Sequence, residues 1–241
     1  MPNPILNDNN FNEQERILEG TPMTINGTIQ ITAFLGLLLI CAATFVWSRF
    51  SAGYTDLGMM LMGGGLIVGF ILGLIIAFTR NKMLIPVYAV CEGCALGGIS
   101  SIFESQFPGI VLQAVAGTFA ALFSMLVLYK LRVIQATDKF RSVIFISTAS
   151  IAAVYLVDII GSFFGLHVPL INSSSTAGIA VTLIVVVIAA LNLILDFDFI
   201  ERGEQMMLPK DFEWYGAFGL MVTLVWLYVE ILRLLAKINR K

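Results

Sequence analysis

Four carboxylic acids lie within long apolar stretches of the sequence or at their ends. These are Glu92, Asp158, Asp196 and Glu230, and Asp198 follows Asp196 two positions later. An isolated carboxylate is strongly disfavoured in hydrocarbon, so each acid must be protonated, share a proton with another acid or bind a cation. All three of these states change with pH. The acids therefore predict a proton or ion site inside a membrane.

The surroundings of these acids indicate a function more strongly for some than for others. Apolar residues flank Glu92 and Glu230 for several positions on each side, which favours a functional role. Asp196 and Asp198 close an apolar run, in LNLILDFDFIERGE, where a helix end would leave them in water. For Asp198, simple solvation is the favoured interpretation. For Asp196, solvation and a functional role are equally good interpretations. Asp158 comes about two turns before the end of its run, where a structural role explains it equally well.

The composition defines the class of protein. Hydrophobic residues make up 58% and charged residues 12% of the 241 residues, which is more apolar surface than a soluble globule can bury. We therefore expect an all-α, polytopic integral membrane protein with the lipid bilayer as its surroundings. The net charge is −2 and no basic stripe appears, so nucleic acid is not an expected partner.

Cysteine and histidine usage excludes several kinds of site. Cys41, Cys91 and Cys94 all fall in apolar runs, which argues against a disulfide framework. The CxxC formed by the last two is interpreted as a packing feature. The one histidine, His167, is expected in a loop, so His-based metal sites and a serine triad are excluded. We expect no cofactor.

Seven apolar runs of about twenty residues are each long enough to cross a bilayer. They cover residues 28–47, 57–78, 84–103, 110–128, 143–164, 177–195 and 212–236. Short loops leave no room for a second soluble domain, so we expect a polar tail over 1–27 and one seven-helix domain over 28–241. In the second span, Gly65, Gly69 and Gly73 form a small-residue face for close helix packing. No basic residue is expected at mid-membrane. Arg80, at the end of the second span, is the nearest basic residue that could bond to one of the acids.

Lysine and arginine gather in alternate segments between the spans. They precede the first span and follow the second, fourth and sixth, whereas Arg49 alone occupies the other loops between spans. Because basic loops stay in the cytoplasm, this bias predicts a cytoplasmic amino terminus. Short loops and the lack of an organelle signal favour a bacterial plasma membrane.

The chain resembles the Bax inhibitor family of membrane proteins, also called the transmembrane Bax inhibitor motif family. The resemblance covers all seven spans and rests on Phe78-Thr79-Arg80, on Tyr88 and Gly93, on LDFDFI ending the sixth span and on LYVEILRLL in the seventh. It implies a last helix packed centrally in a bundle of six. It also implies a pH-sensitive calcium leak, with calcium and protons as the ions handled.

The resemblance also assigns roles to individual residues. In the family, an acid in the sixth span and one in the last share a proton, and an arginine ending the second span latches onto them. The matching residues here are Asp196, Glu230 and Arg80, and the two acids would bind calcium transiently. Glu230 replaces the aspartate usual in the family and Glu92 adds an acid outside its pattern. Asp198 falls where the family usually has a polar uncharged residue.

Helix geometry leaves a second arrangement of the acids open. If the last helix starts near Gly216, Glu230 lies roughly 21 Å along it, whereas Asp196 is only about 10 Å from the end of its own helix. The acids would then form an inner level with Glu92, Asp196 and Arg80 and an outer level with Asp158 and Glu230. A later start of the last helix, or a break in it at Gly216 or Gly219, would bring Asp196 and Glu230 to the same depth and restore their pairing.

The function expected from these acids together with the family resemblance is a proton-gated calcium leak. Asp196 and Glu230 would sense protons, because two carboxylates in contact hold one proton between them and separate or recruit a cation when it is lost. Arg80 would be the inner gate. A non-conducting regulator that binds another membrane protein is the alternative. An intramembrane aspartyl protease is a remote one, because the Gly-x-Gly-Asp signature is missing.

Overall fold

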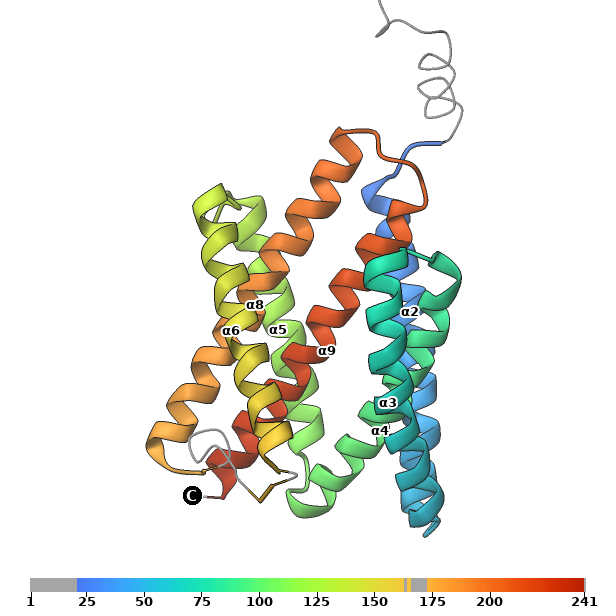
Figure 1. Ribbon diagram of the computed structural model, residues 1–241, viewed down its shortest axis with the longest axis vertical. Coiled ribbons are helices and arrows are strands. Elements are labelled where there is room, and N and C mark those ends of the chain that lie inside the picture. Colours follow the sequence, from blue (N-terminus) through green and yellow to red (C-terminus); the bar gives the residue numbers. More distant parts are fainter. Residues whose placement is uncertain (1–20, 163, 166–172, 241) are drawn as a thin grey trace, which may run out of the picture.

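The computed structural model describes residues 21–162, 164–165 and 173–240. This part of the chain contains no β-strand and folds into seven α-helices, each long and apolar enough to cross a membrane, with a short 3-10 helix (Lys82–Leu84) before the third. The predicted all-α architecture with seven spans is therefore confirmed. The helices are α2 (Ile25–Ser51), α3 (Thr55–Thr79), α4 (Ile85–Gln106), α5 (Ile110–Lys130), α6 (Asp138–Ser162), α8 (Thr176–Gln205) and α9 (Phe212–Asn239) (Figure 1).

Helix α8 departs most from its predicted span. It continues ten residues past the predicted end at 195 and stops at Gln205, shortly before Met207, whose φ of 52° breaks the right-handed helix. Asp196 and Asp198 therefore lie inside a helix and not at its end, which corrects the prediction. The other helices begin and end within five residues of the predicted positions.

The polar tail predicted over residues 1–27 overlaps the first helix at its carboxyl end. Helix α2 begins at Ile25, so the last residues of the segment 1–27 belong to the first span. The Thr24 side chain caps this helix by accepting a hydrogen bond from Gly27 N at 2.9 Å. Residues 1–20, and His167 further along, lie outside the described part of the chain.

The glycines of the second span provide a packing face, as predicted. A Cβ at Gly65 would lie 2.9 Å from Ala95 N, and one at Gly73 would lie 3.3 Å from the Tyr88 ring, so α3 approaches α4 closely. Cys91 and Cys94 are free thiols on the facing side of α4, where the backbone of the first and the Cβ of the second meet Gly65. Their role in this interface is packing.

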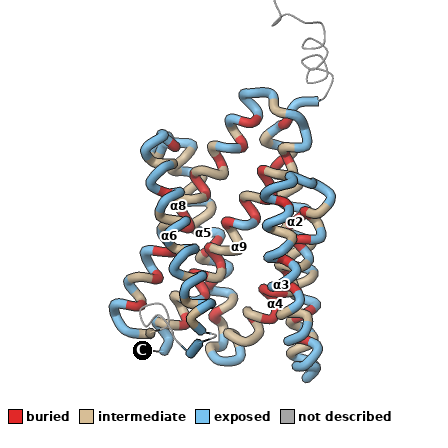
Figure 2. Tube along the Cα trace, in the orientation of Figure 1, coloured by how far each residue is buried: buried red, intermediate tan, exposed pale blue. Residues whose placement is uncertain are grey.

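Helix α9 runs obliquely between two groups of helices, α2–α3–α4 on one side and α5–α6–α8 on the other (Figure 1). It packs against α8, α2, α5 and α4 and carries buried positions along much of its length (Figure 2). Leu227 and Leu232 join it to the core near α8, whereas Ala217 joins it to α2 and α3. Its placement at the centre of a bundle of six stays a prediction.

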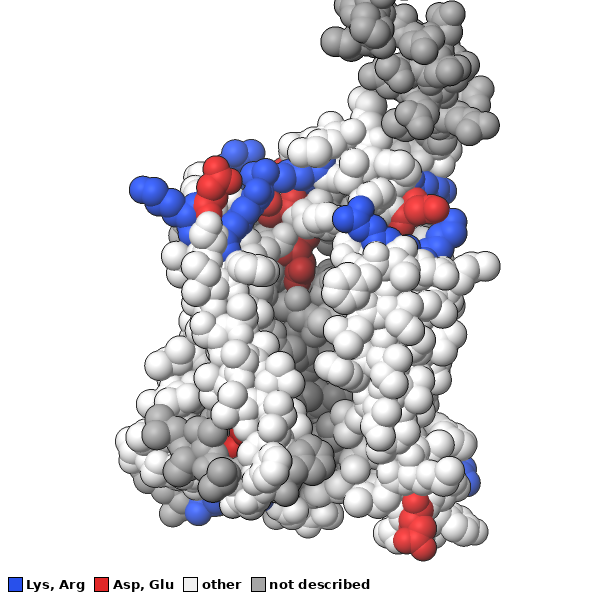
Figure 3. Space-filling model, in the orientation of Figure 1, with Lys and Arg blue, Asp and Glu red and all other residues white. Residues whose placement is uncertain are grey.

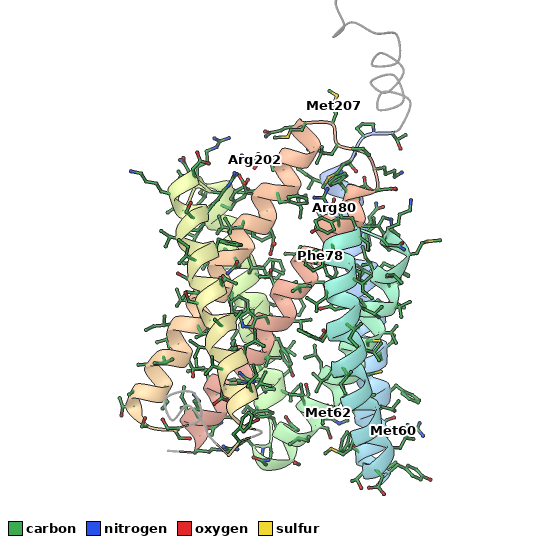
Figure 4. All side chains as sticks on the ribbon, in the orientation of Figure 1. Met60, Met62, Phe78, Arg80, Arg202 and Met207 are labelled. Carbon is green, nitrogen blue, oxygen red and sulfur yellow. The ribbon has the colours of Figure 1, made fainter. Side chains whose placement is uncertain are left out.

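Basic side chains gather at one end of the bundle, which we call the basic end (Figure 3). Arg80 and Arg202 lie at this end, whereas Met60 and Met62 lie at the opposite end (Figure 4). Figure 3 also shows that the surface is hollowed between the two helix groups, with acidic side chains inside the hollow. The cytoplasmic placement of the basic end stays a prediction.

Candidate functional site

Asp196 lies on the face of α8 that packs against α9, towards the basic end. Its Oδ1 is 3.6 Å from the position that a Cβ would take at Gly219, and the Thr223 side chain, one turn along α9, hydrogen-bonds the same carboxyl group. Its Oδ2 is buried and has no hydrogen-bond partner within the described residues. Such a half-satisfied buried carboxyl group is unusual in a folded protein and is a candidate site for a proton or a cation.

Glu230 lies on α9 towards the opposite end of the bundle, and only 1% of its surface is exposed. Its Oε1 accepts a hydrogen bond of 2.8 Å from the Tyr155 hydroxyl of α6. The same oxygen lies 3.6 Å from Nη1 of Arg233, whose guanidinium stacks over the Tyr155 ring at 5.3 Å from its centroid. Glu230 Oε2 is buried, and no residue that the structure describes donates to it.

The structure does not bring Asp196 and Glu230 together. Helix α9 begins at Phe212 and continues unbroken through Gly216 and Gly219, so nothing shortens the path between the two acids. Because Asp196 faces Gly219, Glu230 lies eleven residues further on, about 16 Å along the axis. The proton-sharing pair implied by the family resemblance is therefore not formed here. The acids instead occupy two levels, which we call the Asp196 level and the Glu230 level.

Glu92 lies at a depth similar to that of Asp196, seven residues into α4, but it contacts different residues. Its carboxyl group hydrogen-bonds Tyr88, and its Oε1 is 3.3 Å from the position that a Cβ would take at Gly69 of α3. Glu92 is thus held in the α3–α4 interface. Asp158 lies one turn beyond Tyr155 on α6, which places it at the Glu230 level.

Asp198 is ion-paired and not simply solvated, which corrects its favoured interpretation. Its carboxylate bonds to Arg141 at the start of α6, and it lies 3.2 Å from Nε of Arg202 on its own helix. The side chain of Asp198 is 15% exposed. These pairs hold α6 against α8 at the basic end, a structural role that separates Asp198 from its neighbour Asp196.

Arg80 does not reach the acids in this structure. It ends α3 in a left-handed conformation, with φ of 53°, and its guanidinium lies over the rings of Phe212 and Tyr215, at 5.7 and 5.6 Å from their centroids. It makes no ion pair with any residue in the described ranges. The latch expected between Arg80 and the acids is therefore not formed, and Arg80 contacts the start of α9 instead.

Two partners of Glu230 were missed from the sequence. We expected no basic residue near a membrane acid, yet Arg233 pairs with Glu230 three positions away. The spacing Glu-x-x-Arg puts both side chains on one helix face, so the signal was present in LYVEILRLL. Tyr155 carried no such signal, because its position against Glu230 depends on how α6 packs beside α9.

One acid with a buried side chain, Glu213, was also missed. It is 2% exposed at the start of α9 and accepts hydrogen bonds of 3.0 Å from both the backbone N–H and the hydroxyl of Thr24. Glu204 accepts a bond of 3.0 Å from Ile25 N. Two carboxylates thus satisfy donors at the amino end of α2, where the helix dipole favours negative charge, and both have structural roles.

No preformed metal centre was found in the part of the chain that the structure describes. No three His, Cys, Asp or Glu side chains there lie close enough together to hold a metal ion. Calcium normally takes six or more oxygen ligands, so one carboxyl group would have to be completed by backbone carbonyls or water. Transient binding of calcium at Asp196 or Glu230 stays a prediction.

Seven apolar helices with acids buried between them define a polytopic integral membrane protein. A protein family described as Bax inhibitor 1 like matches residues 3–240, almost the whole chain. The chain belongs to this Bax inhibitor-like family, as the motifs of its second, sixth and seventh spans indicated. No curated protein matches it.

Proposed function

We propose that the protein is a pH-sensitive leak channel for cations, calcium among them, and not an enzyme. The observation that carries the proposal is the pair of buried carboxyl oxygens, Asp196 Oδ2 and Glu230 Oε2, that have no hydrogen-bond partner among the described residues. Asp196 projects from α8 beside Gly219 of α9, and Glu230 lies on α9 eleven residues further on, so a cation moving along α9 would meet a carboxyl group at two depths. Two separated binding positions are a common requirement for conduction.

In the proposed mechanism, protons and cations compete for the same oxygen atoms. A protonated carboxyl group is neutral and is tolerated in the apolar interior, whereas a deprotonated one requires a cation or water. Calcium suits this role because it prefers carboxylate and carbonyl oxygens. Calcium flux is therefore expected to rise as the pH rises and the acids lose their protons.

Arg80 is proposed to act at the inner entrance, by holding the start of α9 through the rings of Phe212 and Tyr215. Asp196 lies beside Gly219, which is seven positions past Phe212 on α9. Movement of this end of α9 would therefore widen or close the approach to Asp196. Separate acid levels do not suit an aspartyl protease, whose two acids must lie in contact and share one proton.

The proposal is tested by calcium flux into dye-loaded liposomes that contain the purified protein, stepped between about pH 5 and about pH 8. The wild type is expected to show a flux that rises with pH, and Asp196→Asn and Glu230→Gln should each flatten this response. Asp56→Asn is the matched control, because Asp56 is an exposed acid in the first turn of α3.

Two results would overturn the proposal. If both variants keep the wild-type pH response, these acids are not the sensors. If the wild type shows no flux at any pH, the protein is not a leak channel. A non-conducting regulator that co-purifies with another membrane protein would then be the better account.

A further inference from the structure

The Glu230 level holds a cation of its own. The side chain of Arg233 is 45% exposed, whereas that of Glu230 is 1% exposed, so the guanidinium lies between the buried carboxylate and the surroundings of the bundle. It is positioned twice, by its charge contact of 3.6 Å with Glu230 Oε1 and by its stacking over the Tyr155 ring at 5.3 Å. Both contacts hold a positive charge beside the carboxyl group to which a cation would bind.

The charged and titratable groups nearest this position come from α6 and α9. Helix α6 provides the Tyr155 hydroxyl and, one turn further on, Asp158. Helix α9 provides Arg233 and then Lys237, whose Nζ bonds to Thr182 Oγ1 at 2.7 Å and Gly178 O at 3.3 Å on α8. The remaining sequences of α5 and α8 at this depth carry no charged residue. Lys237 also interacts electrostatically with Glu230, but Arg233 is the cation that forms the ion pair of 3.6 Å with it.

We propose that Arg233 is a built-in blocking cation for the Glu230 level: it occupies the position of a bound cation and must leave Glu230 before an ion from outside the protein can bind there. This inference rests on the proposed function and names a regulation of the same site. The ligand class that competes with the guanidinium is a small hard cation, because the atoms around Glu230 that can bind one are carboxylate and hydroxyl oxygens.

Release of Arg233 has a clear physical requirement. A guanidinium about 4 Å from a carboxylate is held by several kcal/mol at low effective dielectric and by far less where water reaches it. The side chain of Arg233 is 45% exposed, so a divalent cation that arrives from outside the bundle can reach it and compete for Glu230. Because Arg233 sits on the same helix as Glu230, its release does not require the bundle to separate.

The test uses terbium, a luminescent stand-in for calcium, titrated at about pH 8 into the full-length protein in detergent. Excited tyrosine transfers energy to bound terbium, and Tyr155 lies 2.8 Å from Glu230. Arg233→Met removes the charge but keeps an apolar stem, and it should tighten the binding of terbium about tenfold, the effect of removing a competing charge worth roughly 1.4 kcal/mol. Arg233→Met combined with Glu230→Gln should lose this gain.

Two further variants complete the test. Arg240→Met removes a cation of the same helix end that bonds to Gln106 at 3.0 Å, away from Glu230, and it should bind terbium as the wild type does. Arg233→Gln is a second neutral variant and should tighten terbium binding as Arg233→Met does, which keeps the test valid if the Met variant folds poorly. Unchanged terbium binding in Arg233→Met, or a gain that survives Glu230→Gln, would overturn the inference.

Flux measurements separate this inference from the proposed function. If the protein is a leak, Arg233→Met should raise calcium flux several-fold at pH 8, while Arg240→Met should not. If no variant conducts but the terbium gain depends on Glu230, the leak proposal fails and the blocking role of Arg233 stands. If the wild type conducts but Arg233→Met changes neither terbium binding nor flux, the blocking role fails alone.

Discussion

The Asp196 level and the Glu230 level place an acid in the same helix bundle in two different ways. Asp196 faces a glycine and a threonine of α9 and has no basic partner in the described ranges. Glu230 accepts a hydrogen bond from Tyr155 and is paired with Arg233. The first acid is tolerated best as a neutral, protonated group, whereas the second is compensated by a positive charge. We infer that protons act first at the Asp196 level and cations at the Glu230 level.

The largest expected effect is a difference in the free energy of unfolding between variants of the two acids. Glu230→Ala leaves Arg233 and Tyr155 without their partner and should lower the free energy of unfolding by about 2 to 3 kcal/mol, because Arg233 is partly exposed. Asp196→Ala removes an acid that has one unsatisfied oxygen, so about 1 kcal/mol is expected. Thermal unfolding in detergent measures both. A loss for Asp196→Ala equal to that for Glu230→Ala would remove the distinction.

A smaller effect should distinguish the two acids that are neighbours on α8. Asp198→Asn takes a charge away from Arg141 and Arg202, and the expected loss is about 1 to 2 kcal/mol at low salt. Asp196→Asn breaks no ion pair and should stay within about 0.5 kcal/mol of the wild type. Melting temperatures at low and high salt check this, since only the Asp198 effect should shrink as salt is added. The opposite salt dependence would contradict the assigned pairs.

The smallest effect concerns Arg80. Its contacts are the rings of Phe212 and Tyr215 at an exposed site, so Arg80→Ala should lower the free energy of unfolding by less than about 1 kcal/mol. Arg80→Lys keeps the charge and should lose less. An ion-paired latch buried against Asp196 would instead give a loss of about 3 kcal/mol or more. Thermal unfolding of the two variants decides between these descriptions.

Much of the fold could be predicted from the sequence because the membrane leaves few choices. Every backbone group in hydrocarbon must bond internally, so each apolar run of sufficient length becomes a helix. A close helix contact at α3 also followed from Gly65, Gly69 and Gly73, although the sequence did not identify α4 as the partner helix. The end of α8 was missed, because DFDFIERGE lost the apolar pattern that marks a span but kept the residues that continue a helix.

The acids themselves were predicted, but their partners were not. Membrane depth could be estimated from helix length, and the arrangement with two levels came from that estimate. Which side chain meets Asp196 or Glu230 depends on the rotation of each helix about its axis. That rotation is set by packing in three dimensions, so Gly219 and Tyr155 could not be assigned from the sequence. Arg233 was within reach, because its spacing from Glu230 alone places the two on one helix face.

The central claim is that Asp196 and Glu230 act at separate levels, and a double-mutant cycle tests it most directly. The free energies of unfolding of the wild type, Asp196→Asn, Glu230→Gln and the double variant would be compared in the same detergent. Acids about 16 Å apart along α9 should give additive effects, with a coupling energy below about 0.5 kcal/mol. A coupling above about 1 kcal/mol would show that the two acids share a proton in contact, which would contradict the separate levels.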